Sequence, residues 1–260
     1  MSMRLFRSLL CGMFLGAVLM GCVKERRGQC PCLLELDFTR LDTSVVESAR
    51  VNILGPGGFV FDESVSAEAF VDGMFVNVPK GGCMLCVYSG EQGMAAPERG
   101  LCIPYGEDCP PVYMCAAFLD TGCEQYRKVV LLRKNYCMLS ICVEDVEHFP
   151  FNLAVRGGVA GYGADGSLVQ GEFYCLLKAF SNARSTISVP RQLDDSMVLE
   201  VNDGTEVLKT FALGEYIRAS GYDWNAADLE DITVGIDYTR TKLTVSVLGW
   251  DEVYEFDVVI

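Results

Sequence analysis

Apolar and polar residues alternate along much of the chain, and this pattern predicts strands. From Cys32 to Phe38, apolar side chains occupy every second position, with Glu35 and Asp37 between them. A period of two places the apolar residues on one face of a β-strand. The same alternation, or a short apolar run between turn residues, recurs at 51–53, 59–61, 75–78, 83–88, 129–133, 137–143, 151–155, 173–177, 186–189, 197–201, 232–238, 243–247 and 254–260.

Helical spacing is rare by comparison, and residues 213–220 are the best helix candidate. Many short strands with turn residues between them and almost no amphipathic helix are typical of β-sandwiches. The chain is therefore predicted to be all-β.

Two stretches interrupt the strands. Residues 89–111 are rich in Gly, Pro and acids and lack periodicity, so we expect a long surface loop there. Residues 144–150 break the strand pattern with acids and a proline. A domain boundary placed there divides the chain into one β-sandwich at residues 30–147 and a second at 148–260.

Residues 1–21 have the form of an export signal. Arg4 and Arg7 precede an apolar run at residues 9–20. That run is shorter than the roughly 18–20 residues that a helix needs to cross a bilayer. It therefore indicates a cleaved signal peptide rather than a transmembrane helix.

Residues 19–22, Leu-Met-Gly-Cys, resemble the bacterial lipobox, in which a small residue precedes a cysteine that becomes the acylated N-terminus. The small Gly21 would let the peptidase approach, and the Cys22 thiol would accept diacylglycerol. After cleavage between Gly21 and Cys22, the new amino group of Cys22 would accept an acyl chain. Each buried methylene contributes about 0.8 kcal/mol, so several chains give stable attachment. Residues 22–29 would form a polar tether. The alternative is an ordinary secretory signal with a chance cysteine.

Composition excludes several functions. With 21 Lys and Arg against 35 Asp and Glu, the formal net charge is −14, which argues against a nucleic-acid partner. His148 is the single histidine, so a His-rich metal site is ruled out and a catalytic triad would depend on that residue. No Gly-x-Ser-x-Gly motif accompanies it. We therefore expect no enzyme activity, metal, further cofactor or small-molecule substrate.

Two short motifs have structural explanations. Gly161–Gly166 matches Gly-x-Gly-x-x-Gly, but neither a following helix nor an acid about 20 residues later supports a dinucleotide site, so a glycine-rich hairpin is predicted. Cys83 and Cys86 form a Cys-x-x-Cys pair in a run that is apolar on both faces. Positions i and i+3 of a strand point to opposite faces, so these are expected to be structural cysteines in a strand between two layers.

The chain has thirteen cysteines. Removal of Cys11 with the signal peptide and acylation of Cys22 would leave eleven, and because this number is odd, at least one cysteine must stay unpaired. Cys30 and Cys32 lie at the edge of bridgeable distance on an extended strand. Cys102 and Cys109, in the predicted loop, are the better disulfide candidates. Trp224 and Trp250 are expected to be core or inter-strand aromatics rather than ligand platforms.

The order of several motifs resembles the FimB-type fimbrial anchor lipoproteins of Bacteroidales-type bacteria. After the lipobox cysteine come a Cys-Pro opening with a first strand, a Val-Pro-Gly element with a following strand, a strand pair, and a characteristic C-terminal end. These matches lie at residues 30–36, 76–81 with 87–90, 130–135 with 141–143, and 213–217 with Trp224, 232–234 and the Trp250 strand.

This resemblance implies two tandem transthyretin-like β-sandwiches, held to the outer membrane through Cys22 and exposed at the cell surface. It also implies a role at the base of a fimbria, which holds the fibre to the cell and limits its length. The implied partner is a shaft subunit, docked by strand addition. In this system shaft subunits mature by cleavage after an arginine, and a cut at Arg40 or Arg50 would remove the lipid from this chain.

The docking strand that we predict is the C-terminal segment 253–260, which alternates up to the last residue and could equally close the second sandwich. Its candidate docking residues are Val253, Tyr254, Phe256, Val258 and Ile260. The alternative function is that of a surface adhesin or glycan-binding lipoprotein. That function would need exposed aromatics in a groove, for which Tyr105, Tyr113 and Tyr162 are the candidates.

Overall fold

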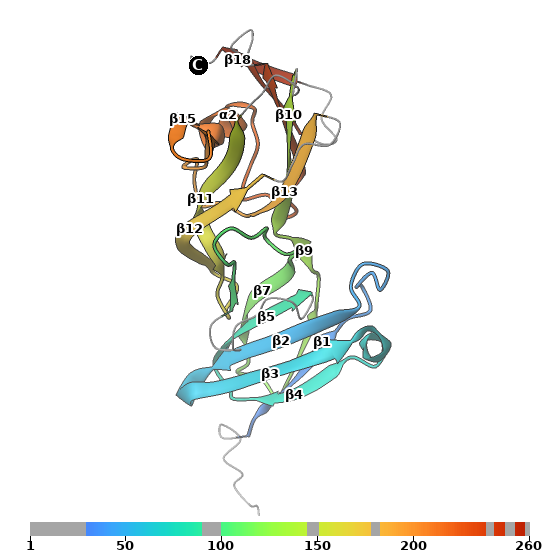
Figure 1. The fold of residues 1–260 in the computed structure, drawn as a ribbon. Coiled ribbons are helices and arrows are strands. Elements are labelled where there is room, and N and C mark those ends of the chain that lie inside the picture. The colour runs from blue at the N-terminus through green and yellow to red at the C-terminus, as the bar shows by residue number, and fades with distance from the viewer. Residues whose placement is uncertain are drawn as a thin grey trace, which may run out of the picture.

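The computed structural model describes residues 30–89, 100–144, 151–177, 183–237, 242–247 and 253–257. These residues form eighteen strands and one α-helix, α2 (Leu213–Ala219), so the all-β prediction and the single predicted helix are confirmed. The strands build two sandwiches arranged one after the other along an elongated molecule (Figure 1). Gly21, Cys22, His148, Trp250, Val258 and Ile260 lie outside the described residues.

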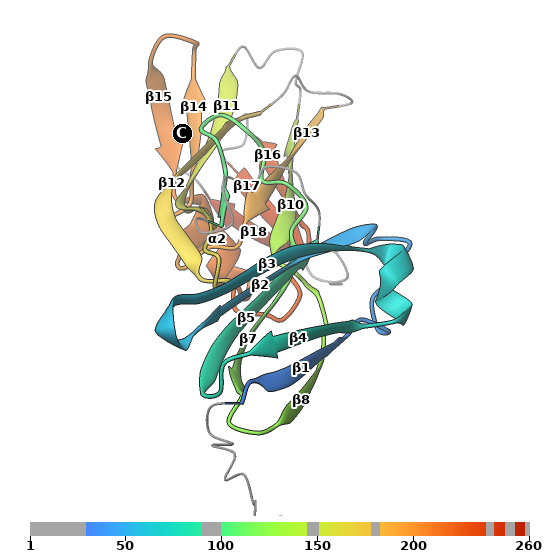
Figure 2. The same cartoon turned by 90° about the horizontal axis from the view of Figure 1, so that it is seen from below.

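The first sandwich packs a three-stranded sheet, in the order β4-β1-β8, against a five-stranded sheet, in the order β3-β2-β5-β7-β9. Figure 2 shows the smaller sheet facing β2, β3, β5 and β7. The strands are β1 (Cys32–Asp37), β2 (Ser48–Gly55), β3 (Phe59–Ser66), β4 (Met74–Val78), β5 (Gly82–Ser89), β7 (Tyr113–Asp120), β8 (Gln125–Val129) and β9 (Arg133–Lys134). Two 3₁₀ turns, η2 (Pro56–Gly58) and η3 (Ala67–Val71), join β2 to β3 and β3 to β4.

The second sandwich also has two sheets. One has the order β13-β10-β16-β17-β18, and the other has the order β12-β11-β14-β15, with β6 joined to β11. The strands are β6 (Leu101–Cys102), β10 (Tyr136–Val143), β11 (Asn152–Tyr162), β12 (Leu168–Leu176), β13 (Arg184–Pro190), β14 (Val198–Asn202), β15 (Val207–Phe211), β16 (Ile232–Asp237), β17 (Lys242–Val247) and β18 (Val253–Asp257).

The chain passes between the sandwiches earlier than the sequence pattern suggests. A boundary at 147–148 would leave β10 in the first sandwich, but β10 pairs with β13 and β16 of the second. The crossing lies at Asn135, between β9 and β10. The segment around β6, from the predicted loop, also joins the second sandwich. Alternation reveals which face of a strand is buried but not which sheet it joins, so β10 could not be placed from its pattern.

Four strands were absent from the sequence prediction or displaced in it. β7 and β15 were not predicted, and the expected strand at 129–133 is replaced by the end of β8 and the start of β9. Val130 lies between these two strands, fully buried, and its N–H donates to the Asp37 carbonyl at 2.9 Å. The apolar run therefore spans the junction between two strands that belong to different sheets.

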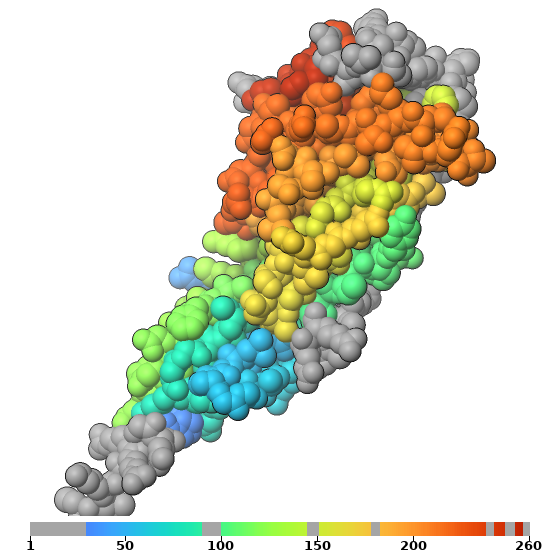
Figure 3. Space-filling model, turned by 90° about the vertical axis from the view of Figure 1, so that its left-hand side faces the viewer, coloured from blue at the N-terminus to red at the C-terminus, as the bar shows by residue number. Residues whose placement is uncertain are grey.

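The glycine-rich hairpin is confirmed, since β11 and β12 pair antiparallel across a turn at residues 163–167. Its tip packs against the first sandwich, where this hairpin lies next to the N-terminal strands (Figure 3). A Cβ on Gly166 would lie 2.5 Å from Ala116 Cβ and 3.3 Å from Cys86 Sγ. Gly166 also has a φ of +83°, which disfavours other residues. The motif therefore serves close packing between the sandwiches rather than nucleotide binding.

A Gly166→Ala substitution is expected to destabilise the protein by about 2–4 kcal/mol, because it adds a contact clash to backbone strain. The matched control is Gly106→Ala. Gly106 has a similar φ of +89° but open space around the added Cβ, so strain alone of about 1–2 kcal/mol is expected. Denaturant unfolding of the two variants measures the difference. An equal loss of stability in the two variants would mean that the hairpin tip does not pack against the first sandwich.

Candidate functional site

The described chain enters the first sandwich at the middle of its smaller sheet. Cys30 is exposed, and two residues later β1 begins between β4 and β8. β1 pairs antiparallel with β4 and parallel with β8, so both of its edges are occupied. Any force on the predicted tether at 22–29 would therefore load a strand that is hydrogen-bonded on both sides.

Side-chain packing holds β1 as firmly as its backbone does. Cys32, Leu34 and Leu36 are fully buried, and Phe38 stacks on Phe70 with ring centroids 5.3 Å apart. Burying such apolar side chains stabilises a fold by roughly 1.5–3 kcal/mol each. The strand therefore cannot leave the sandwich without exposing a large part of its core.

The end of β1 is further fixed by charge. Asp37 accepts hydrogen bonds from the Thr39 hydroxyl at 2.6 Å and from Arg127 of β8 at 2.8 Å. The Thr39 hydroxyl and N–H, followed by the Arg127 guanidinium, lower the pKa of Asp37 to about 2. The carboxylate thus stays ionised, and its bond to Arg127 ties β1 to β8 over the whole neutral pH range.

The other end of the molecule carries the C-terminal strand β18. β18 pairs with β17 and is the last strand of its sheet among the described residues. Phe256 packs against Tyr216 of α2, with ring centroids 5.0 Å apart, and Glu255 pairs with Lys242. Residues 253–257 therefore close the second sandwich, which is one of the two roles that the sequence left open. Tyr254 is half-buried, Val253 is exposed, and β18 lies at the opposite end of the molecule from β1 (Figure 1).

An apolar contact joins the two sandwiches. The faces of β5 and β7 that point away from the first core contribute Cys86, Tyr88 and Met114 to the second core. Cys83 lies in the first core, so the two cysteines of the Cys-x-x-Cys motif point to opposite faces, as predicted. Burial raises the pKa of Cys86 to about 12, which keeps its thiol protonated. The motif is thus structural, and β5 is buried on both faces.

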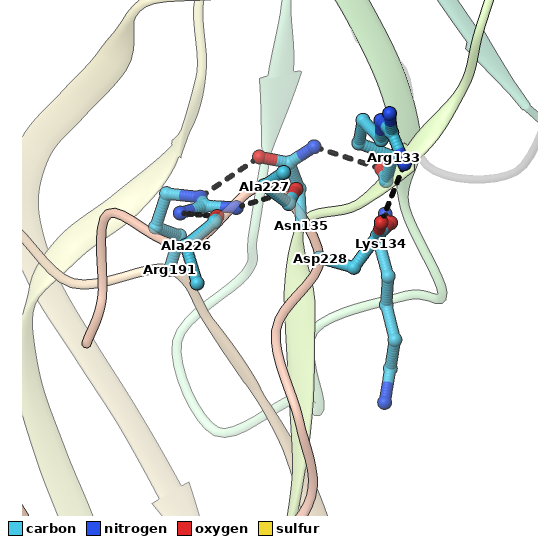
Figure 4. A network of polar contacts seen from close by, with 7 residues as sticks. All are labelled: Arg133, Lys134, Asn135, Arg191, Ala226, Ala227 and Asp228. Atoms are coloured by element: carbon cyan, nitrogen blue, oxygen red, sulfur yellow. Dashed lines mark hydrogen bonds and ion pairs between the residues drawn. The ribbon is translucent and has the colours of Figure 1, made fainter. Parts of the chain in front are cut away.

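A polar network reinforces this junction at the crossing residue (Figure 4). Asn135 donates from its Nδ2 to the Arg133 carbonyl and accepts at Oδ1 from Arg191 Nε, both at 2.9 Å. Arg133 forms an ion pair with Asp228 at 2.9 Å, and the Lys134 N–H donates to the same carboxylate at 2.8 Å. The chain between β9 and β10 is therefore held on both sides.

Arg191 is the centre of this network. Its guanidinium donates to the backbone carbonyls of Trp224, Ala226 and Ala227 as well as to Asn135. Burial lowers the pKa of Arg191, but the side chain remains charged and satisfied by these acceptors. Tyr162 also belongs to this network. Its hydroxyl donates to the Asn135 backbone carbonyl and accepts from the Arg191 backbone N–H. Sequence patterns gave no sign of Arg191, since its partners are mostly backbone carbonyls.

The predicted aromatic residues fall into different environments. Tyr162 is buried in the network above, and Tyr113 is half-buried beside a cleft of about 470 Å³ between the sandwiches. Trp224 is buried in the second core, as expected. Tyr105 is 64% exposed and stacks on Tyr174, with centroids 4.6 Å apart and an interplanar angle of 9°.

Charged groups surround this exposed pair of tyrosines. The Arg156 guanidinium lies 5.2 Å from the Tyr174 ring centroid and pairs with Glu172 and Glu200. Next to Arg156 is an open hollow of about 530 Å³, lined by Gly157, Gly158, Gly171, Glu172 and Asp194 among others. We call Tyr105, Tyr174, Arg156, Glu172 and Glu200 the tyrosine platform.

The predicted disulfide cysteines lie in different environments. Cys102 is exposed and Cys109 is buried, and both are free thiols in the structure. Cys109 donates instead to the neighbouring Pro110 carbonyl at 3.3 Å. Within the described residues, no group of His, Cys, Asp and Glu is arranged to hold a metal ion. No helix in this part of the chain has the length and apolarity to span a membrane.

Comparison with known proteins identifies the fold. No family model matches the chain, and no curated protein sequence does so either. Among solved structures, the fimbrial anchor protein Mfa2 of Porphyromonas gingivalis has a TM-score of 0.58 at 12% identity, over 85% of this chain and 98% of that one.

The chain shares the fold of Mfa2. A candidate polysaccharide-binding protein of Bacteroides thetaiotaomicron matches similarly, with a TM-score of 0.59 at 12% identity over 86% of this chain and 98% of that one. A candidate adhesin of Bacteroides ovatus has a TM-score of 0.56 at 12% identity, over 88% and 96% of the two chains. The tandem β-sandwich fold implied by the sequence resemblance is therefore confirmed, and these matches extend to the fold alone.

Proposed function

We propose that the chain is an outer-membrane lipoprotein that anchors a fimbria to the cell and limits its length. The observation that carries the proposal is the placement of its two ends. The predicted lipid tether leads into β1, in the middle of a sheet at one end of the molecule, and the strand at the edge of the last sheet, β18, lies at the other. The reinforced junction at Asn135 and Arg191 would transmit force between them.

The similarity of fold to Mfa2, a fimbrial anchor protein, supports this assignment. Docking of a shaft subunit is assigned to the outer edge of β18, where strand addition would extend the sheet β13-β10-β16-β17-β18. The candidate contact residues there are Val253 and Tyr254, with Phe256 holding the strand on its own sandwich.

An anchor must keep the strand that carries its lipid. Arg50 lies within β2 and pairs with Asp62 at 2.6 Å, so the backbone after it is poorly accessible to a protease. Arg40 lies in an exposed turn directly after β1. A cut after Arg40 would separate β1 and the lipid from the rest of the chain, so the proposed anchor role requires that β1 stays in place.

Affinity isolation from detergent-solubilised envelopes tests the proposal. A tagged full-length chain is expected to co-purify a fimbrial shaft subunit, identified by mass spectrometry. Val253→Pro, at the exposed start of β18, should reduce recovery of this subunit while the chain remains folded by circular dichroism. Recovery of the chain without any fibre protein, from cells that display fimbriae, would refute the proposal.

Glycan binding is the second candidate function, and the tyrosine platform favours it. An exposed tyrosine pair offers apolar ring faces to a sugar, and nearby carboxylates and a guanidinium can bond its hydroxyls. If this function holds, Tyr105→Ala should weaken binding on an array of neutral and acidic oligosaccharides by about tenfold, or 1.4 kcal/mol.

The control for the glycan test is Phe75→Ala, which removes an exposed aromatic residue from β4 in the other sandwich. It should leave glycan binding unchanged. The absence of binding by the wild-type chain to every oligosaccharide on the array would remove this function from consideration.

A further inference from the structure

The parallel pairing of β1 with β8 brings two cysteines together. Leu33 is in register with Gln125, and the Leu33 N–H donates to the Glu124 carbonyl at 2.9 Å. This register sets Cys32 opposite Glu124, and Cys123 lies one residue earlier, in the bend that precedes β8. Strands about 4.8 Å apart with a one-residue offset of about 3.3 Å give a Cα separation of roughly 6 Å, within the range of about 4.4–6.8 Å found in disulfides.

The two side chains lie near one another. After burial, the interaction with the Cys123 side chain is the next largest cause that raises the pKa of Cys32. The Cys123 thiol also lies 3.0 Å from the Gln125 carbonyl, so its sulfur is turned toward the start of β8. Cys32 is buried and Cys123 is exposed, and both are free thiols in the structure. Cys123 is therefore accessible to an oxidant in solvent, and the buried Cys32 lies next to it.

We propose that Cys32 and Cys123 form a disulfide that covalently fixes the N-terminal strand β1 to the body of the first sandwich. The predicted export signal would place the chain in a compartment where disulfides persist. The bridge closes a loop of roughly 90 residues across the sandwich.

The reaction consists of two thiol–disulfide exchanges with an external disulfide, either a small molecule or a dithiol oxidase. The exposed Cys123 sulfur first bonds to one sulfur of that disulfide, and the other leaves as a thiol carrying the Cys123 proton. The Cys32 thiolate then attacks the Cys123 sulfur and expels the second external sulfur, which takes up the proton lost by Cys32. The external disulfide is reduced to two thiols, and the two cysteines are oxidised.

The second exchange has a characteristic pH dependence. Burial is the largest cause that raises the pKa of Cys32, and it persists after Cys123 has reacted. Because the thiolate is the nucleophile, closure of the mixed disulfide by Cys32 in the folded chain should accelerate as the pH rises from 7 to 9.

The bridge has a consequence that rests on the proposed anchor function. A cut after the exposed Arg40 would leave β1 held in the sheet only by non-covalent contacts. With Cys32 bonded to Cys123, the lipidated segment would stay attached to the body after such a cut. The anchor would then keep its membrane attachment under conditions in which shaft subunits lose their N-terminal strand.

Peptide mapping of the envelope protein tests the bridge. Free thiols are blocked with N-ethylmaleimide before lysis, and the full chain is digested with trypsin without reductant. The expected product is peptide 28–40 linked to peptide 100–127, which separates on reduction. Cys123→Ser, at an exposed position, should abolish the linked peptide. Cys30→Ser, the matched control two residues from Cys32, should retain it.

Three results would overturn the proposal. They are unlinked peptides from folded wild-type protein, loss of the link in Cys30→Ser, or a link between Cys32 and Cys83, which also lies in the first core. This readout needs neither a fibre nor a lipid, so failure of the anchor function would leave it interpretable. Conversely, a chain that anchors fibres without the bridge would refute only the bridge.

Discussion

Replacing Cys22 with serine is expected to release the chain from the cell envelope and its fibres into the medium. Residues 1–21 would still direct export, but serine carries no thiol to accept diacylglycerol. Even one acyl chain binds a membrane with an association constant of only about 10⁴ M⁻¹, so stable anchoring needs two or more attachments. A chain without any acyl group should bind more weakly still. Loss of the predicted acyl acceptor should therefore release most of the chain.

Fractionation followed by immunoblotting measures this release, and electron microscopy of the medium detects the fibres. Cys30→Ser is the matched control, because it removes another exposed thiol eight residues downstream without touching the lipobox. That variant should remain in the envelope. Cys22→Ser protein that still sediments with envelopes and keeps its fibres attached would contradict lipid anchoring at this residue.

Replacing Arg191 with alanine is expected to cost about 3 kcal/mol of stability. The change leaves the Trp224 and Ala226 carbonyls and Asn135 Oδ1 without their donor at the junction between the sandwiches. Leaving a buried acceptor unsatisfied costs about 1–3 kcal/mol, and hydrogen bonds from charged groups lie at the upper end of their range. Unfolding in denaturant should therefore begin at a clearly lower concentration.

The control for this prediction is Arg218→Ala. Arg218 lies in α2, is 68% exposed and pairs with Asp195 at 2.9 Å. An exposed ion pair contributes only about 0–1 kcal/mol. If the two variants lose the same stability, Arg191 is not the centre of the junction.

The sequence predicted best what depends on side-chain periodicity. The alternation from Cys32 to Phe38 predicted β1, and the run at 83–88, apolar on both faces, predicted a strand between two layers. The opposed directions of Cys83 and Cys86 followed from the same period of two. The glycine-rich motif was also correctly interpreted as a hairpin, because the chemistry of a dinucleotide site was incomplete.

What the sequence could not supply depends on contacts between distant segments. β10 has the alternation of any half-buried strand, and only its pairing with β13 and β16 shows that it belongs to the second sandwich. β8 has a weak apolar pattern, with side chains that are exposed or half-buried, and only its parallel pairing with β1 shows that it is a strand. Arg191 and the proximity of Cys32 to Cys123 have no local signature, since both depend on segments that are far apart in the chain.

The cysteine prediction illustrates the same limit. Cys102 and Cys109 were chosen because loop cysteines are free to approach one another, but one is exposed and the other is packed in the second core. The pair that the structure brings close together lies where β1 pairs with the start of β8. A register between strands so far apart in the chain cannot be derived from their separate patterns.

The position of the chain on the fibre tests the anchor assignment most directly. Immunogold labelling of a tagged chain on cells that carry intact fimbriae should place the label at the cell-proximal end of each fibre, and the Cys22→Ser variant should carry it on the base of shed fibres. Labelling along the shaft or at the distal tip would contradict the anchor assignment.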